Sequence, residues 1–270
     1  FLILADFVSG GDGPLTTDVN AVSGTNGNDT IDGVIGVSGT FTVGDNINGG
    51  SGTDTLSLQM QSNAGAPLVT LSNVENVNIR LLEAAPGTAF AVNAIDWAGV
   101  STLSFDNSLD ETAIRVSGLT TAPAIRVQNE VDVSIDYRGL SSGTDSVSLT
   151  LTTAGSGGGT AASLGSAGVA DIDLDLDDAG LIDSLTVTLV GKNYAVLEAG
   201  ADLRTITLQG SGGGYLSTDD EITTFNAAAL SSGIDVTFSG ASDISITGGA
   251  GGDTFRMRTC LLYTSPSPRD

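Results

Sequence analysis

Glycine-rich turns that end in an aspartate are the part of this chain best suited to chemistry. Gly49–Ser57 reads Gly-Gly-Ser-Gly-Thr-Asp-Thr-Leu-Ser, the pattern GGxGxDxUx in which U is a large apolar residue. The glycines allow positive φ angles, so backbone carbonyl groups can point into a tight turn. Asp54 adds a carboxylate at the mouth of the turn, and we expect Leu56 to lie on a strand that packs into a core. Carbonyl and carboxylate oxygens are the ligands that calcium prefers, at about 2.3–2.6 Å.

The same pattern recurs in partial copies. Asp45–Asn48 supplies its second half nine residues before the matching part of the complete copy. Gly24–Asp32 matches except for Thr25 in place of the second glycine, and Gly248–Phe255 matches again. Ser142–Leu149 is a reduced version. Several copies in one chain favour a shared role for these turns, and a glycine turn without metal is the alternative for each single copy.

The spacing of the aspartates predicts an uneven set of calcium sites. Asp45 and Asp54 are nine residues apart, so we expect one site near them. Asp29 precedes Asp45 by 16 residues, which is not a multiple of nine, and is expected to contribute to a second site. Asp243 and Asp253 are ten residues apart, so Asp253 is expected to form only half a site. The candidate ligands are Asn26, Asn28, Asp29, Asp45, Asn48, Gly50, Gly52, Asp54, Gly249, Gly251 and Asp253.

The composition excludes several other kinds of site. The chain has no histidine, and its single cysteine is Cys260. Histidine is the commonest general base and the usual ligand of zinc, copper and iron, so its absence disfavours such sites. With 32 acidic and 9 basic residues the net charge is −23. Such a charge disfavours nucleic acid and anionic lipid as partners, because both are polyanions.

The two ends of the chain call for separate treatment. Residues 260–270 resemble the in-frame translation of a sequencing-library adapter, and we expect them to be a non-native tail. The chain opens on Phe1 without an initiator methionine, so we expect a fragment that begins inside a longer protein. Residues 1–259 are predicted to form one elongated domain, with calcium-type turns at residues 24–57 and 240–255.

A hexapeptide repeat indicates how the turns are positioned. It consists of an apolar residue, two mostly polar residues and then an apolar-polar-apolar run, and this alternation is typical of a strand with one buried face. The copies are Val74–Ile79, Val100–Phe105, Ile182–Val187, Leu203–Leu208 and Ile222–Ala227. More divergent copies are expected at Ala124–Val127, Val131–Ile135 and Val147–Leu151. Spacings of 26, 21 and 19 residues fit the coils of a solenoid that stack over a shared apolar column. We therefore predict an all-β fold, an elongated parallel β-helix or β-solenoid with short turns of the nonapeptide type, with a β-sandwich as the alternative.

The nonapeptides resemble the calcium-binding, hemolysin-type repeats of RTX proteins. Gly24–Asp32 with Gly49–Ser57 looks like the spaced pairs of RTX-type surface-layer proteins and large adhesins, and Leu71–Val77 is similar to the rungs between such pairs. The resemblance implies folding on calcium outside the cell and type I secretion, without an N-terminal signal peptide and with a C-terminal secretion signal. The chain departs from the family in offering isolated pairs separated by long rungs, in place of many nonapeptides in succession.

The predicted function is a calcium-stabilised structural or adhesive module of a secreted bacterial cell-surface protein, and not an enzyme. Calcium is the expected cofactor, and self-association or a cell-surface polysaccharide are candidate interactions; no nucleic acid partner and no membrane span are expected. A polysaccharide-active β-helix enzyme and a phage fibre-like solenoid are the alternatives. For an enzyme, Lys192–Tyr194 is the best available cluster, although a simple turn after Gly191 is the preferred interpretation. Trp97 is expected to cover the apolar column and not to stack on a sugar.

Overall fold

The fold was obtained as a computed structural model. It describes residues 6–9, 13–61, 65–82, 90–107, 113–129, 132–138, 140, 145–155, 172–175, 182–200, 202–218, 221–240 and 243–258. These residues form strands joined by turns and bends, with no helix among them. It follows that the described part of the chain contains no helix of a length and apolarity that would cross a membrane. The expected non-native tail, residues 260–270, lies outside the described residues.

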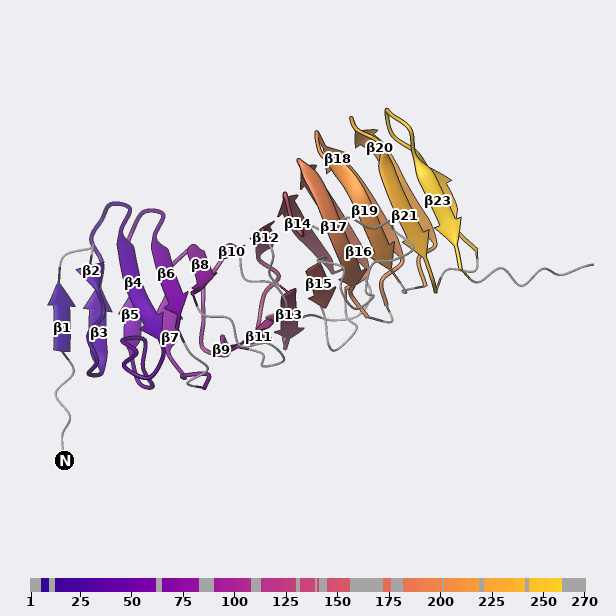
Figure 1. The fold of residues 1–270 in the computed structure, drawn as a ribbon. Coiled ribbons are helices and arrows are strands. Elements are labelled where there is room, and N and C mark those ends of the chain that lie inside the picture. The colour runs from indigo at the N-terminus through magenta and orange to yellow at the C-terminus, as the bar shows by residue number, and fades with distance from the viewer. Residues whose placement is uncertain are drawn as a thin grey trace, which may run out of the picture.

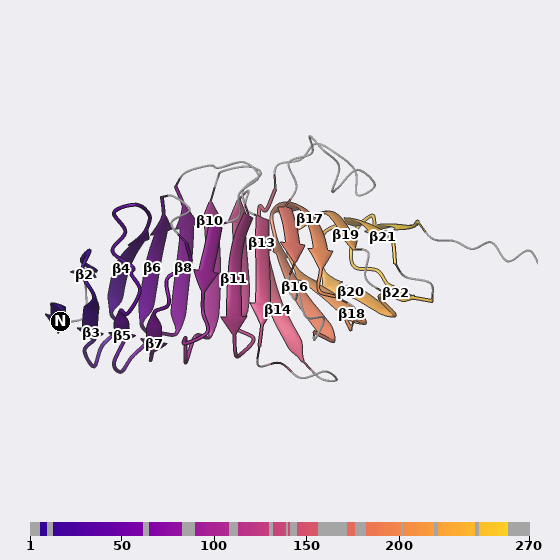
Figure 2. The same ribbon diagram turned by 90° about the horizontal axis from the view of Figure 1, so that it is seen from below.

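The chain alternates strictly between two sides of a parallel β-solenoid, which confirms the predicted fold class (Figure 1). The even-numbered strands form one eleven-stranded sheet, in the order β2 (Gly13–Pro14), β4 (Thr30–Ile35), β6 (Thr55–Met60), β8 (Asn76–Leu81), β10 (Thr102–Asn107), β12 (Ala124–Asn129), β14 (Ser146–Thr152), β16 (Ser184–Val190), β18 (Thr205–Gly210), β20 (Thr224–Leu230) and β22 (Ser245–Thr247). A four-stranded sheet contains β1 (Asp6–Ser9), β3 (Asn20–Ser23), β5 (Asn46–Asn48) and β7 (Thr70–Ser72). An eight-stranded sheet contains β9 (Phe90–Asn93), β11 (Ala113–Leu119), β13 (Asp132–Tyr137), β15 (Ile172–Asp175), β17 (Lys192–Glu198), β19 (Gly213–Thr218), β21 (Ile234–Phe238) and β23 (Thr254–Met257). Both views show the strands side by side along one elongated body (Figures 1 and 2).

The hexapeptide copies all belong to the eleven-stranded sheet, where they lead into β8, β10, β16, β18 and β20. Val77 pairs in register with Leu103, and Ile206 pairs with Phe225, so equivalent positions of the repeat lie side by side. Two of the divergent copies also belong to this sheet, on β12 and β14. The described part of the third, Val131–Ile135, belongs to β13 of the eight-stranded sheet instead. All these pairings are parallel, as a solenoid requires and an antiparallel sandwich does not.

Inward-facing side chains stack in columns from coil to coil. One column consists of Ile31, Leu56, Val77, Leu103, Ile125, Leu149, Val187 and Leu208, each at most 1% exposed. Burying a large aliphatic side chain stabilises a fold by about 1.5–3 kcal/mol, and no coil can cover its own column. Trp97 is 4% exposed and belongs to the same core, as its predicted covering role requires.

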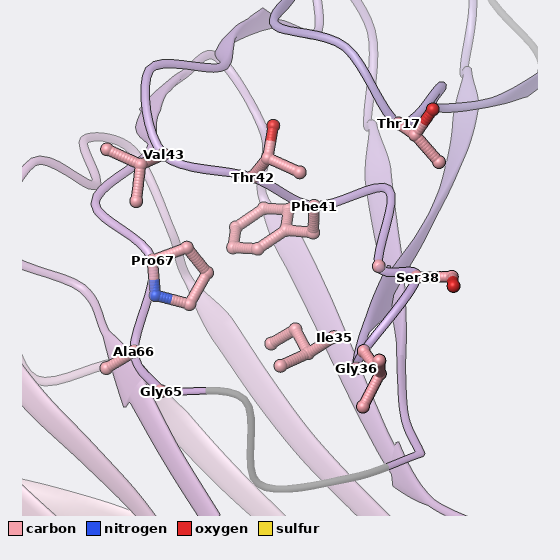
Figure 3. Close-up of a pocket in the computed structure, with 12 residues that line it drawn as sticks. Thr17, Ile35, Gly36, Ser38, Phe41, Thr42, Val43, Gly65, Ala66 and Pro67 are labelled. Atoms are coloured by element: carbon pink, nitrogen blue, oxygen red, sulfur yellow. The ribbon is translucent and has the colours of Figure 1, made fainter.

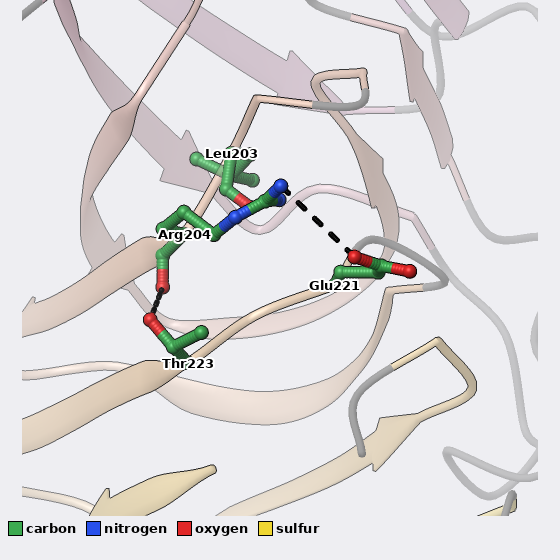
Figure 4. Close-up of polar contacts among 4 residues, drawn as sticks. All are labelled: Leu203, Arg204, Glu221 and Thr223. Carbon is green, nitrogen blue, oxygen red and sulfur yellow. Dashed lines mark hydrogen bonds and ion pairs between the residues drawn. The ribbon is translucent and has the colours of Figure 1, made fainter. Parts of the chain in front are cut away.

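Polar side chains on the outside of the coils also contact neighbouring coils. The Thr223 hydroxyl donates to the Arg204 carbonyl oxygen at 3.3 Å, and the Arg204 guanidinium lies 4.0 Å from the Glu221 carboxylate (Figure 4). The Arg204 and Glu221 side chains are 41% and 79% exposed, and exposed ion pairs contribute about 0–1 kcal/mol. The buried columns therefore determine how the coils stack.

Candidate metal site

The two N-terminal glycine–aspartate turns stack directly on each other, one coil apart. Thr30 pairs in register with Thr55, 25 residues later. Three hydrogen bonds connect the turns: Gly24 N–H to Asn48 O at 2.8 Å, Ser51 N–H to Thr25 O at 3.0 Å, and Thr53 N–H to Asn28 Oδ1 at 2.9 Å. Asp29 and Asp54 consequently occupy the same corner of adjacent coils.

A column of carboxylates caps this corner. Asp54 Oδ1 accepts a hydrogen bond from the Asp29 backbone N–H at 2.7 Å. In the next coil Glu75 Oε2 accepts one from the Asp54 N–H, also at 2.7 Å. Asp29 and Asp54 are 5% and 1% exposed, so these N–H groups would otherwise be buried without an acceptor. Each carboxylate thus accepts a hydrogen bond from the backbone N–H of the residue that precedes a strand in the coil before it.

The first glycine of the motif is required because the aspartate carboxylate packs over its Cα atom. A methyl group added to Gly24, Gly49 or Gly248 would lie 2.7, 2.6 or 2.8 Å from Oδ2 of Asp29, Asp54 or Asp253, respectively. The methyl groups at Gly24 and Gly49 would also collide with a carbonyl oxygen of the next coil, that of Gly49 and of Asn73. A carboxylate oxygen and a carbonyl oxygen therefore converge over the same glycine, at two successive levels of the solenoid.

One of these carboxylate oxygens has no hydrogen-bond partner. In two of the turns, the N–H that follows the first glycine donates to Oδ2 of the motif aspartate, from Thr25 at 2.5 Å and from Gly249 at 2.9 Å. In the middle turn the equivalent N–H, that of Gly50, donates instead to Asn48 Oδ1 at 3.1 Å. Asp54 Oδ2 is left buried and unpartnered. A buried, unpaired carboxylate oxygen is costly unless a cation or a proton joins it.

The pKa of Asp54 predicts how stability depends on pH without metal. Burial raises the pKa of Asp54 above its ordinary value of 3.8, and the charges of Asp29 and Glu75 add to this, whereas the hydrogen bond from the Asp29 backbone lowers it. Because the folded protein holds this proton more tightly than the unfolded chain, the contribution of Asp54 to stability grows as pH falls through its folded pKa and is lost as pH rises. In buffer freed of calcium with a chelating resin, we expect the melting temperature of the wild type to rise relative to that of Asp54→Asn as the pH falls from neutral towards the ordinary carboxyl pKa of 3.8. A difference that stays constant over this range would contradict the assignment.

Asp45 lies in another part of the coil. It precedes β5 of the four-stranded sheet, whereas Asp54 precedes β6 of the eleven-stranded sheet. Asp45 Oδ1 accepts from the Asn20 N–H and Oδ2 from the Thr42 N–H, both at 2.7 Å. Both carboxylate oxygens of Asp45 therefore already accept backbone hydrogen bonds. Coil stacking brings Asp54 next to Asp29, and not next to Asp45.

The other predicted ligands lie in comparable turns or at their surface. Gly50 and Gly52 have φ angles of +100° and +129°, as the tight turn requires. Asn26 is exposed in the turn that precedes Asp29. At the far end of the solenoid, next to Gly251, Asp253 accepts from the Ile234 N–H at 3.2 Å and from the Gly249 N–H at 2.9 Å.

Three members of these capping columns were not identified by the sequence motifs: Asn20, Glu75 and Asp183. Asp183 Oδ2 accepts from the Asp145 N–H at 2.9 Å, which repeats the arrangement in the reduced copy, whose residues 142–144 lie outside the described part of the chain. A signal exists for two of the three. Glu75 and Asp183 both occupy the second position of a hexapeptide copy. In the strand register, Glu75 is aligned with Asp54 and Asp183 with Asp145.

The Asp29–Asp54 corner presents only oxygen atoms as possible metal ligands. Among the described residues no three acidic side chains form a ready cluster for a metal ion. The possible ligand atoms are Asp54 Oδ2, which has no hydrogen-bond partner and lies beside the Asn73 carbonyl, and Asp29 Oδ2, which lies beside the Gly49 carbonyl and already accepts hydrogen bonds from Thr25. Calcium takes six to eight oxygens of mixed origin, so carbonyl groups and water would complete its coordination. A site built only from oxygen is poorly matched to zinc or copper.

A hollow of about 720 Å³ lies near the end of β4, away from this corner. Figure 3 shows Ile35, Phe41, Val43 and Pro67 around it. None of its 12 lining residues is ionisable. The lining offers contact surface, but it supplies no group for acid–base chemistry.

No protein-family model, curated protein or solved structure matches the chain.

Proposed function

We propose that this chain is a calcium-stabilised structural or adhesive module of a secreted bacterial cell-surface protein, of the surface-layer or RTX adhesin type. The observation that carries the proposal is the stacked pair of turns at Asp29 and Asp54, with the buried and unpartnered Oδ2 of Asp54. A carboxylate oxygen held in this way needs a positive charge or a proton, and calcium is the hard cation abundant outside cells.

The residues proposed to hold calcium are Asp29 and Asp54, with the carbonyl groups of Gly49 and Asn73. Bound calcium would neutralise these carboxylates and tie neighbouring coils together. Binding free energy at a site that exists only in the folded state adds to folding stability. The chain's own part is to bring the oxygens together, which it does through the Asp29 N–H···Asp54 bond and the two glycines.

A structural role accounts for the composition better than catalysis does. The chain lacks histidine, and Lys192 is its only lysine. The inward-facing side chains of the repeated strands form stacked apolar columns, and these columns stabilise an extended body. Such a body suits a module that spans distance or forms contacts at a cell surface.

The test is a thermal melt of residues 1–259, monitored by far-ultraviolet circular dichroism. It is recorded in EGTA, in millimolar calcium and in millimolar magnesium. We expect a higher melting temperature in calcium, because a ligand that binds only the folded state stabilises it by about 2.7 kcal/mol at 100 times its Kd. Magnesium should have a smaller effect, since it demands a regular octahedral site. Identical cooperative melts in all three solutions would refute the proposal and favour a fibre-like solenoid whose turns work without metal.

A further inference from the structure

A row of side chains crosses the last four strands of the eight-stranded sheet. Tyr194, Tyr215, Asp235 and Thr254 are paired in register from β17 to β23. The rings of Tyr194 and Tyr215 stack with their centroids 5.2 Å apart and their planes at 16°. Because Asp235 is short and not aromatic, the stack ends at Tyr215. Tyr194 therefore covers one face of the half-buried Tyr215 ring, and the opposite face is directed towards Asp235.

A groove of about 300 Å³ begins at Tyr215 and extends over β21 and β23. Its floor contains Gly214, Gly233 and Gly252, which place no side chain in it. At Gly214 an added methyl group would collide with the Asn193 carbonyl oxygen, and at Gly233 it would lie 2.5 Å from the Gly252 carbonyl oxygen, so the close stacking of coils demands glycine at both positions. At Gly252 there is no atom within 4 Å of such a methyl group, and this space belongs to the groove.

The rim of the groove is polar. Lys192 Nζ lies 5.0 and 5.2 Å from the ring centroids of Tyr194 and Tyr215. The Lys192 side chain is a charged donor at neutral pH, and a side-chain hydrogen bond to Tyr194 raises its pKa further above the ordinary value of 10.5. Asp235 on the same rim forms an ion pair with Arg256, and Thr254 is exposed. The rim thus presents donors and acceptors around one aromatic face.

We infer that this groove binds a neutral saccharide, with the free face of Tyr215 as the stacking platform and Lys192, Asp235 and Thr254 as hydrogen-bonding groups. A pyranose ring has an apolar face of C–H groups and a border of hydroxyl groups, which matches an aromatic surface bordered by polar side chains. Arg256, which is not part of the lining, is already paired with Asp235, and the chain carries a net charge of −23, so a polyanionic ligand is disfavoured. The site lies apart from the Asp29–Asp54 corner and does not depend on the calcium proposal.

The test is saturation-transfer difference NMR on the full chain with cellotriose, maltotriose and tri-N-acetylchitotriose. Trigalacturonate and adenosine serve as acidic and aromatic comparison ligands. We expect millimolar binding of a neutral trisaccharide to the wild type and to Tyr215→Phe, which keeps the ring. Tyr215→Leu removes the ring and should weaken binding about tenfold, in line with the contribution of one aromatic contact. Gly252→Leu fills the groove at a position with free space and should abolish the signal.

The outcomes separate this site from the calcium site. Each variant is measured in EGTA and in calcium, with circular dichroism to establish that it is folded. About tenfold weaker binding by folded Tyr215→Leu and loss of binding by folded Gly252→Leu, in EGTA and in calcium alike, support the inference, whatever calcium does to the melting temperature; unchanged binding by Tyr215→Leu would overturn it. Binding of none of the three neutral trisaccharides, unchanged binding by Gly252→Leu, or a preference for trigalacturonate or adenosine would overturn it.

Discussion

Replacing Gly49 with alanine is expected to lower the free energy of unfolding by about 3 kcal/mol, at the upper end of what overpacking costs. The added methyl group would collide with the Asn73 carbonyl oxygen and lie 2.6 Å from Asp54 Oδ2. The backbone at Gly49 cannot move away freely, because its N–H donates to the Ser72 carbonyl oxygen of the next coil at 3.0 Å. Urea denaturation in EGTA measures the loss without any contribution from metal.

Gly27→Ala is the matched control for this substitution. Gly27 lies in the equivalent turn one coil earlier, where the nearest atom to an added methyl group is Thr25 Oγ1 at 3.7 Å. The position is exposed, and its φ angle is not in the left-handed region. We expect a change of at most about 0.5 kcal/mol. Equal losses in the two variants would mean that close approach between coils is not the reason for glycine at position 49.

Substitutions at Asp54 are expected to separate its capping role from its role as a calcium ligand. Asp54→Ala should cost about 1–3 kcal/mol in EGTA, because it leaves the buried Asp29 N–H without its acceptor. Asp54→Asn keeps an oxygen for that N–H and removes a buried charge next to Asp29 and Glu75, so it should cost little in EGTA or even stabilise. Both variants should lose the rise in melting temperature on adding calcium.

Asp45→Asn provides the comparison for the calcium response. Both oxygens of Asp45 already accept hydrogen bonds, so the amide should lose the bond from Thr42 and lower stability by about 1 kcal/mol. Its calcium response should remain, because Asp45 lies outside the Asp29–Asp54 corner. If Asp54→Asn keeps the calcium-induced shift and Asp45→Asn loses it, the site follows the nine-residue register of the sequence and our assignment is wrong. Isothermal titration with calcium gives an independent readout for each variant.

The strands and their burial could be predicted from the sequence because alternation is a local property. In Val74–Ile79 and Ile182–Val187, the apolar residues recur at positions that a strand directs to one face, and the structure buries them. Repetition of the same short pattern then indicates stacking, since a coil cannot bury its own column. The glycine requirement at Gly49 was also visible, although its reason was not. Its φ angle is not in the left-handed region, and what demands glycine is the next coil's carbonyl oxygen.

The partners of the aspartates were decided only by the tertiary structure. Asp45 and Asp54 share a nine-residue register, but the coil in this region closes after 25 residues, so Asp54 meets Asp29. Coil length depends on where the turns allow the apolar columns to align, which is a property of the stacked assembly. The unpartnered oxygen of Asp54 depends in addition on Asn48, whose side chain accepts the Gly50 N–H. The sequence by itself determined which residues are strands and which turns carry carboxylates, because those choices are local; which carboxylates meet, and which of them lacks a donor, follows from contacts between coils that are distant along the chain.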